Sequence, residues 1–300
     1  MKNNNKSVLY ALSAVIFWST VATAFKLTLE GMSFAQMLFY SSFFSFLSIS
    51  IIMGFEGKLR YKNLFASKSI KNFALLGLLN PFLYYLVLFK AYSLLPAQEA
   101  QPLNYTWPIA ISIFSVMFLK EKASVSTVFG HIIAFFGVVV IATRGDIFSL
   151  QFHNLYGVIL AAGSSLIWAG FWTIKMLFRE EDSLKLLGSF FFGSVYSLLY
   201  LLITGDFVIP GINYLAGTAY IGFFEMGITF FLWTKGMSLS TNKPKTSTLA
   251  YFSPFISFMF IALILGEKIM LSSIIGLLLI IAGILTQNLK KLFTKKVRPA

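Results

Sequence analysis

Long apolar runs separated by short polar connectors dominate the hydropathy pattern of this chain. A bilayer core of about 30 Å needs about 20 apolar residues in one helix, and reading the sequence with that window predicts ten membrane-spanning helices. The pattern therefore predicts an all-α membrane protein in which five spans are followed by five. We expect these spans at residues 8–28, 34–54, 70–92, 97–119, 125–143, 155–178, 184–204, 212–237, 246–265 and 270–289.

One stretch of the fourth and fifth spans returns, without a gap, 146 residues later. Tyr, Pro, Glu and paired Gly are uncommon in apolar helices, so a chance match between two hydrophobic segments is the weaker explanation. We interpret the recurrence as an internal duplication, with one five-helix repeat in residues 1–148 and a second in residues 149–300. The matched positions are Tyr105, Pro108, Glu121, Lys122, Gly130 and Gly137, which return as Tyr251, Pro254, Glu267, Lys268, Gly276 and Gly283.

Basic residues in the connectors decide the expected orientation. Lys and Arg gather in the two terminal segments and in the connectors on the same side, whereas the connectors on the other side carry only Arg144 and Lys268. The positive-inside rule then places both termini in the cytoplasm, with the chain in the cell inner (plasma) membrane. Because each half has an odd number of spans, the second half should run through the membrane inverted. Inverted repeats are typical of secondary transporters, which bind substrate near the midplane between the halves.

Composition supports a polytopic membrane protein and excludes several other classes. The hydrophobic content of 57% and the mean hydropathy of +0.79 exceed what a soluble core needs. A net charge of +13 would suggest nucleic-acid binding in a soluble chain, but here the charges lie in connectors and the C-terminal tail, where they meet lipid headgroups. With no cysteine and two histidines, we expect no metal site and no cofactor.

Polar residues on the fourth span predict the wall of a cavity. Proline removes a backbone donor, so Pro108 should free the carbonyl of Asn104, and Pro254 should free that of Ala250 in the ninth span. In hydrocarbon a freed carbonyl needs a partner or a wet cavity. The alternative is a kink packed against a neighbouring helix, with the polar groups bonded between helices. The expected face consists of Gln98, Gln101, Tyr105, Pro108 and Ser112.

Aromatic residues of the other spans could complete such a cavity. Trp18, Tyr84, Tyr85, Trp168 and Trp172 have rings with a polar edge, which can enclose a planar ligand and hydrogen-bond to it. The alternative is an ordinary role in packing or in the interfacial belt.

Charged residues inside the spans are the next candidates. Glu225 lies centrally in the eighth span, where a carboxylate must be paired, protonated or in contact with water. We expect it to balance a substrate amine or to carry a proton; the alternative is a structural pair with an intramembrane lysine. Lys26, Lys90, Lys175 and Lys235 lie near span ends, so they should extend to the headgroups, with a substrate carboxylate as the other possible partner.

The spacing of residues that is repeated in the duplicated block also predicts helix packing and helix capping. Gly130, Ala134 and Gly137 of the fifth span, with Gly276 and Gly283 of the tenth, fall on single faces and should allow close helix packing. The carboxylates Glu121 and Glu267 should cap helices or bind neighbouring backbone groups.

Taken together, these residues resemble the drug/metabolite transporter superfamily, and specifically the EamA-type ten-helix transporters. The similarity covers about residues 8–289 and includes the Phe-Trp18-Ser-Thr segment with Lys26, the repeated Pro to Glu-Lys to Gly pattern, which reads Gly-Glu-Lys in the second copy, and Trp168. Several short segments are most similar to the aromatic amino acid exporter subgroup, although Glu225 and Lys90 are charges that depart from it. The resemblance implies a central cavity surrounded by spans one, three, four, six, eight and nine, with two EamA-like repeats.

We therefore predict a secondary transporter, not an enzyme, that exports amino acids, aromatic ones included, or similar small metabolites by alternating access. No Gly-x-x-x-x-Gly-Lys-Ser/Thr loop is present, so ATP should not drive it directly. Import or exchange of a nucleotide-linked solute is one alternative, and an intramembrane enzyme is another. The expected partners are a small-molecule substrate and the lipid bilayer, with no nucleic acid. The expected substrate-binding residues are Trp18, Tyr84, Asn104, Tyr105, Trp107, Pro108, Trp168, Glu225 and Tyr251.

Overall fold

The computed structural model describes residues 2–59, 61–65, 69–118, 125–148, 154–242 and 246–293. These residues form ten helical spans. The connectors 119–124, with Glu121 and Lys122, and 243–245 lie outside the described residues. Spans three, four, eight and nine are each divided into shorter segments, and a short 3-10 helix η1 follows span two. The first five spans are α1 (Lys2–Leu29), α2 (Phe34–Phe55, then η1, Tyr61–Phe65), α3–η2–α4 (Ile70–Gly77, Leu78–Leu83, Tyr84–Leu94), α5–α6 (Ala97–Asn104, Trp107–Phe118) and α7 (Val125–Ala142). The second five are α8 (Leu155–Leu177), α9 (Asp182–Thr204), α10–η3–α11 (Ile212–Tyr220, Ile221–Gly227, Ile228–Leu239), η4–α13 (Thr248–Phe252, Ser253–Ile264) and α14 (Leu271–Phe293).

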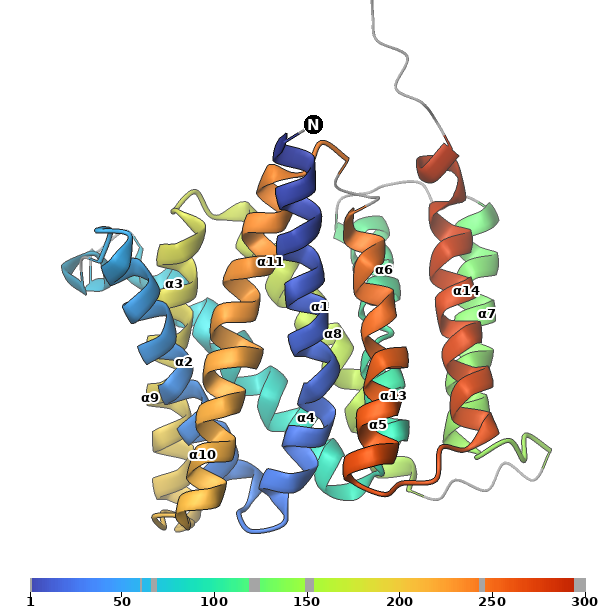
Figure 1. Ribbon diagram of the computed structural model, residues 1–300, viewed down its shortest axis with the longest axis horizontal. Helices are drawn as coiled ribbons and strands as arrows, with labels where there is room; N and C mark the ends of the chain where they lie inside the picture. The colour runs from blue at the N-terminus through green and yellow to red at the C-terminus, as the bar shows by residue number, and fades with distance from the viewer. Residues whose placement is uncertain are drawn as a thin grey trace, which may run out of the picture.

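The two halves are inverted relative to each other, as the odd number of spans in each half predicts. Figure 1 shows α1 running away from the face on which the chain begins, whereas α8, the first helix of the second half, runs toward it. The halves are also interlocked, because most helices pack on partners from the other half: α1 on α11 and α13, α8 on α4, α5 and α6, and α2 on α9. We call the face where α1 begins and α14 ends the N-terminal face (Figure 1).

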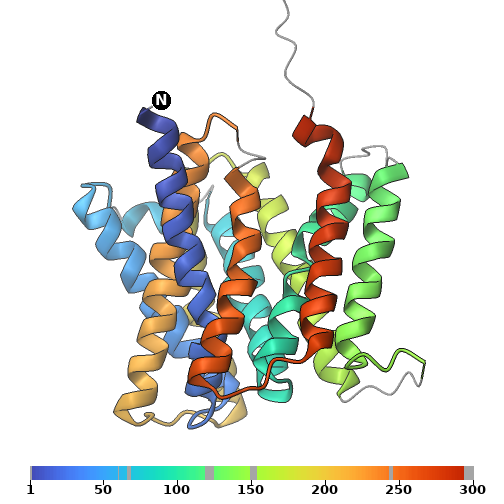
Figure 2. The same ribbon diagram turned by 45° about the vertical axis from the view of Figure 1, so that its right-hand side comes forward.

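Helices α7 and α14 form a pair at one edge of the bundle, where Figure 2 shows them side by side. Small residues lie where the two backbones come closest, as the sequence predicts, and Ile141 and Ile280 pack around them. A Cβ atom added to Gly276 would lie 2.7 Å from the carbonyl oxygen of Gly137, and one added to Gly283 would lie 2.8 Å from the Cβ of Ala134. Only glycine allows the two backbones to approach so closely, so these spans act as scaffold.

The breaks in spans four and nine lie before the prolines, and the carbonyl of Ala250, which was expected to be free, has a partner. Helix α5 ends at Asn104, and Pro108 lies in the first turn of α6, where a missing N–H costs nothing. In span nine, Pro254 also lies in a first turn, and the carbonyl of Ala250 accepts a hydrogen bond from the N–H of Ser253. Each proline therefore starts a second half-helix.

Spans three and eight are irregular at equivalent positions of the two repeats. Asn80 has an extended backbone (φ −147°, ψ 121°), as expected for a residue before proline. Adding 146 to its number gives Met226, which lies in the π-helical segment η3. Both irregular segments pack on a helix of the other half, η2 on α9 and η3 on α2. A Cβ added to Gly222 of η3 would lie 2.6 Å from the carbonyl oxygen of Ser41.

Candidate functional site

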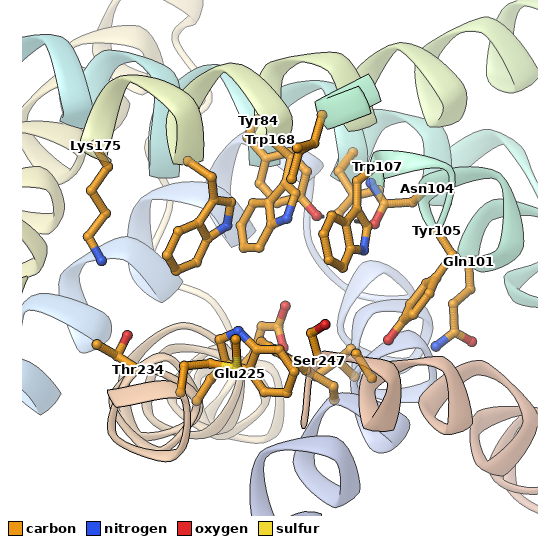
Figure 3. Close-up of a pocket in the computed structure, with 18 of the residues that line it drawn as sticks. Tyr84, Gln101, Asn104, Tyr105, Trp107, Trp168, Lys175, Glu225, Thr234 and Ser247 are labelled. Atoms are coloured by element: carbon orange, nitrogen blue, oxygen red, sulfur yellow. Dashed lines mark hydrogen bonds between the residues drawn. The ribbon is translucent and has the colours of Figure 1, made fainter. Parts of the chain in front are cut away.

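A cavity of about 460 Å³ lies between the two halves of the bundle. Its lining comes from spans one, three, four, six, eight and nine, with Asp182 at the start of span seven, and the described residues of α7 and α14 do not contribute. Figure 3 shows Lys175, Trp168, Tyr84, Trp107 and Asn104 on one wall, and Thr234, Glu225 and Ser247 on the opposite wall. The central cavity predicted between inverted repeats is therefore present.

Seven of the nine residues predicted to bind substrate line this cavity, although binding itself stays a prediction. Pro108 and Tyr251 do not line it. The ring of Pro108 belongs to the first turn of α6, and Tyr251, in η4, packs against the hydrophobic core. The seven that line the cavity are Trp18, Tyr84, Asn104, Tyr105, Trp107, Trp168 and Glu225.

Aromatic rings form most of the cavity wall. The rings of Trp168 and Tyr84 have centroids 4.7 Å apart, and those of Trp18 and Trp233 are 5.1 Å apart. Trp168 also contacts Trp172, with centroids 5.8 Å apart, so the contacts continue along α8. With Trp107, these residues are all five tryptophans of the chain, and every one lines the cavity. Such a wall suits a planar or aromatic ligand.

Asn104 connects the aromatic wall to the neighbouring span. Its Oδ1 accepts a hydrogen bond from the Tyr84 hydroxyl at 3.2 Å, and its Nδ2 donates to Ser164 Oγ at 2.8 Å. Thr106, in the break between α5 and α6, is bonded similarly to Ser165 at 3.0 Å. The amide of Asn104 therefore fixes Tyr84 relative to α8, and the broken helix is held against the second half.

Glu225 lies on the cavity wall within η3 and is 6% exposed. Its Oε1 accepts a hydrogen bond from the Tyr85 hydroxyl at 3.1 Å, and its Oε2 has no hydrogen-bond partner. Within the described ranges no lysine or arginine nitrogen lies within 4.0 Å of its carboxylate, so the structural pair with a lysine is not found. Two other lining residues, Gln101 and Thr234, also have side-chain polar atoms without partners.

The four lysines near span ends have different surroundings. Lys26 donates to the carbonyl oxygens of Tyr92 and Leu95, at 3.0 and 3.1 Å, and so caps the end of α4. The Lys90 ammonium lies 4.9 Å from the centroid of the Phe34 ring, and Lys235 is exposed on α11.

Lys175 is the one of these four lysines that lines the cavity. Although it is 3% exposed, it ion-pairs with Asp182 at 3.6 Å, and its ammonium lies 4.6 Å from the centroid of the Trp172 ring. Asp182 also pairs with Lys185 at 3.1 Å. Met176 lies next to Lys175 near the end of α8, and Ser238 lies near the end of α11. Both residues line the cavity and are exposed, so the cavity opens toward the N-terminal face, where these two helices end.

The opposite end of the bundle is closed by hydrogen bonds between the halves. The carboxylate of Glu267 accepts from the N–H groups of Ala97 and Gln98, at 2.9 and 3.3 Å, and so caps α5 as its predicted structural role requires. In return, the Gln98 amide donates to Lys268 O at 2.9 Å and accepts from Met270 N at 2.7 Å. Gln98, expected on the cavity face, therefore joins the start of α5 to the connector between α13 and α14 instead.

Sequence reasoning missed two lining residues of importance, Trp233 and Asp182. The four-residue spacing from Trp233 to Met237, and from Thr234 to Ser238, places all four on one side of α11. That spacing was available in the sequence. Asp182 gave no comparable indication, because its connector position is typical of a solvated charge.

Comparisons with known proteins agree with this architecture. The profile of the EamA-like transporter family matches residues 5–143 and 155–289. An uncharacterized transporter of Archaeoglobus fulgidus is 27% identical over 287 residues, which are 93% of this chain and 97% of that protein. The aromatic amino acid exporter YddG of Ancylobacter novellus is 27% identical over 176 residues, 58% of this chain and 61% of that one. A solved crystal structure with 22% identity superposes with a TM-score of 0.67 over 97% of this chain and 99% of its own, which supports the fold.

The inverted helical repeats, the central cavity and these relatives define a multi-pass membrane transporter. The chain belongs to the EamA-like transporter family.

Proposed function

We propose that the protein is a secondary transporter that exports amino acids, aromatic ones included, or similar small amphipathic metabolites by alternating access. The observation that carries this proposal is that all five tryptophans surround one cavity between inverted halves. The substrate ring would lie among these tryptophans, while Glu225 and Asn104 contact its polar groups. The similarity to an aromatic amino acid exporter favours the same substrate class.

The proposed direction of transport follows from the cavity's opening and from the connector charges. In the sequence, Lys and Arg are concentrated in the terminal segments and in the connectors that follow spans ending on the N-terminal face, so we place that face in the cytoplasm. The cavity would then load from inside the cell and release outward after the halves rock. We further propose that the repeats divide after residue 148, next to the segment 149–153 that lies outside the described residues.

The nucleotide-linked alternative is less well supported. Such a solute would need several cationic groups to bind its phosphates. Lys175 is the one cation among the described lining residues, and it is ion-paired with Asp182.

Counterflow in proteoliposomes tests the proposal. Vesicles preloaded with unlabelled phenylalanine or tryptophan should accumulate the labelled amino acid, and Trp168→Ala should reduce the initial rate by at least about tenfold, because a large buried contact surface is lost. The variant Phe136→Ala, at an exposed position on α7, serves as a matched aromatic control and should transport normally. Absence of counterflow with every amino acid and aromatic amine would refute the proposed class of substrate.

A further inference from the structure

The charged groups of the cavity do not balance. Three charged side chains line it within the described part of the chain: Lys175, Asp182 and Glu225. Lys175 and Asp182 form an ion pair at the mouth, with 3.6 Å between nitrogen and oxygen, so their charges cancel. The carboxyl group of Glu225 has no such partner, and the cavity therefore has an acidic group without a basic one facing its aromatic wall.

An ionised carboxylate in this position needs a cation, and without one it can take up a proton. An ionised carboxylate removed from water is costly unless it is paired and hydrogen-bonded. The single hydrogen bond from the Tyr85 hydroxyl satisfies Oε1 and leaves Oε2 unpartnered. Tyr85 itself is fully buried and contacts Tyr84, with ring centroids 4.6 Å apart, so it holds the carboxylate in one orientation.

The surrounding rings also favour a positive ligand. The face of a tryptophan ring carries negative electrostatic potential and attracts ammonium groups within about 6 Å. Lys175 already shows such a contact, with its ammonium 4.6 Å from the Trp172 ring centroid. Thr234, on the same wall as Glu225, adds an unpartnered hydroxyl that can accept an ammonium N–H (Figure 3).

We propose that Glu225 binds the ammonium group of an aromatic amine, and that the cavity therefore prefers net cations to zwitterionic amino acids. This inference rests on the proposed function, because it assumes that the transported solute occupies this cavity. The carboxylate of a zwitterion would enter a cavity where the one cation among the described lining residues, Lys175, is already paired with Asp182. Only neutral donors, such as the amide of Gln101, remain for it.

Three ligands that share a phenyl ring on a two-carbon chain test the proposal directly. Phenethylamine carries one positive charge, phenylalanine is a zwitterion, and 3-phenylpropionate carries one negative charge. Binding to the purified full-length protein is measured by isothermal titration calorimetry at neutral pH. We expect phenethylamine to bind at least about tenfold tighter than phenylalanine, and 3-phenylpropionate to bind weakest, as one charged hydrogen bond predicts.

Glu225→Gln assigns the preference to this carboxylate. The amide keeps the shape and can still accept from Tyr85, so the fold should persist, and a neutral ligand, 3-phenylpropanol, should bind as in the unmodified protein. Phenethylamine affinity should fall at least about tenfold. Glu30→Gln, at an exposed carboxylate near the end of α1, should leave all affinities unchanged.

The outcomes separate this inference from the proposed function. Phenylalanine binding as tightly as phenethylamine, or an undiminished preference for the amine in Glu225→Gln, would overturn the inference and leave an amino acid transporter standing. If none of the four ligands binds, the proposed function of the cavity fails together with the inference.

Discussion

Replacing Glu267 by alanine should loosen the closed end of the bundle. Glu267 lies in the connector between α13 and α14, and its two carboxylate oxygens accept the N–H groups of Ala97 and Gln98 at the start of α5. These N–H groups have no partner within their own helix, and the helix dipole makes the same position favourable for a negative charge. The substitution removes both acceptors at once.

The expected loss of stability can be worked out from these contacts. Hydrogen bonds to a charged group contribute about 1.5–3 kcal/mol each when buried. Glu267 is half-buried, so water can replace part of each contact, and we take about 1 kcal/mol for each of the two bonds. The free energy of unfolding should then fall by about 2 kcal/mol, which corresponds to a decrease in Tm of about 3 °C for a chain of this size.

Thermal unfolding in detergent, followed by tryptophan fluorescence, measures this change. Glu267→Gln should lie between the alanine variant and the unmodified protein, because it keeps one acceptor without the charge. Gln98→Ala breaks the reciprocal bonds to Lys268 and Met270 in the same junction, so the double variant should be less destabilised than the sum of the single ones. An unchanged Tm in Glu267→Ala, or strictly additive effects, would show that the junction does not act as one unit.

Three further predictions concern packing, topology and a surface ion pair. Gly276→Ala should lower Tm by several degrees, since overpacking costs about 1–3 kcal/mol, and should leave ligand affinity unchanged because α14 lies outside the cavity. Gly163→Ala is the control, because no heavy atom lies within 4 Å of its added Cβ. Equal changes in Tm for the two variants would contradict this prediction. Because the chain has no cysteine, single cysteine variants can be labelled selectively. Ser238→Cys should react with an impermeant thiol reagent only in inverted vesicles, and Asp206→Cys only in intact cells. The reverse labelling pattern would show that the N-terminal face is outside the cell. The Lys58 ammonium lowers the pKa of the Glu181 carboxyl and the carboxylate raises the pKa of Lys58, so the pair is intact at neutral pH and is lost as pH falls through the lowered pKa of Glu181. Both side chains are about half exposed, so Lys58→Ala should leave Tm unchanged at physiological salt, and a clear decrease would show that the pair is structural.

The positions of the spans could be predicted from the sequence, because length and apolarity are direct requirements of the bilayer. Span six, expected at 155–178, is α8 at Leu155–Leu177, and span two, expected at 34–54, is α2 at Phe34–Phe55. Pro108 and Pro254 correctly indicated that spans four and nine are interrupted. They did not indicate that each proline starts a second half-helix instead of lying inside one continuous helix. A proline is tolerated inside a helix or at its start, and only the surrounding packing decides which occurs.

The site could be predicted only in part. Tryptophans and a central glutamate are rare enough in apolar helices to stand out, and Glu225, Trp18 and Trp168 line the cavity. The partner of Glu225 was not predictable, since the Tyr85 hydroxyl reaches it across 140 residues of sequence. The role of Gln98 was missed for a similar reason: its partners lie in a loop of the other repeat.

The interlocking of the two halves has a consequence for the origin of the gene. Each half buries its helices mainly against the other, as in the contacts of α1 with α11 and of α8 with α4. A half-length ancestor would therefore have exposed these surfaces unless two copies inserted in opposite orientations and paired antiparallel. Fusion of the duplicated genes would then have fixed one orientation for each copy. Once the orientation was fixed, selection could place Lys and Arg in the connectors of one side, as the present sequence shows.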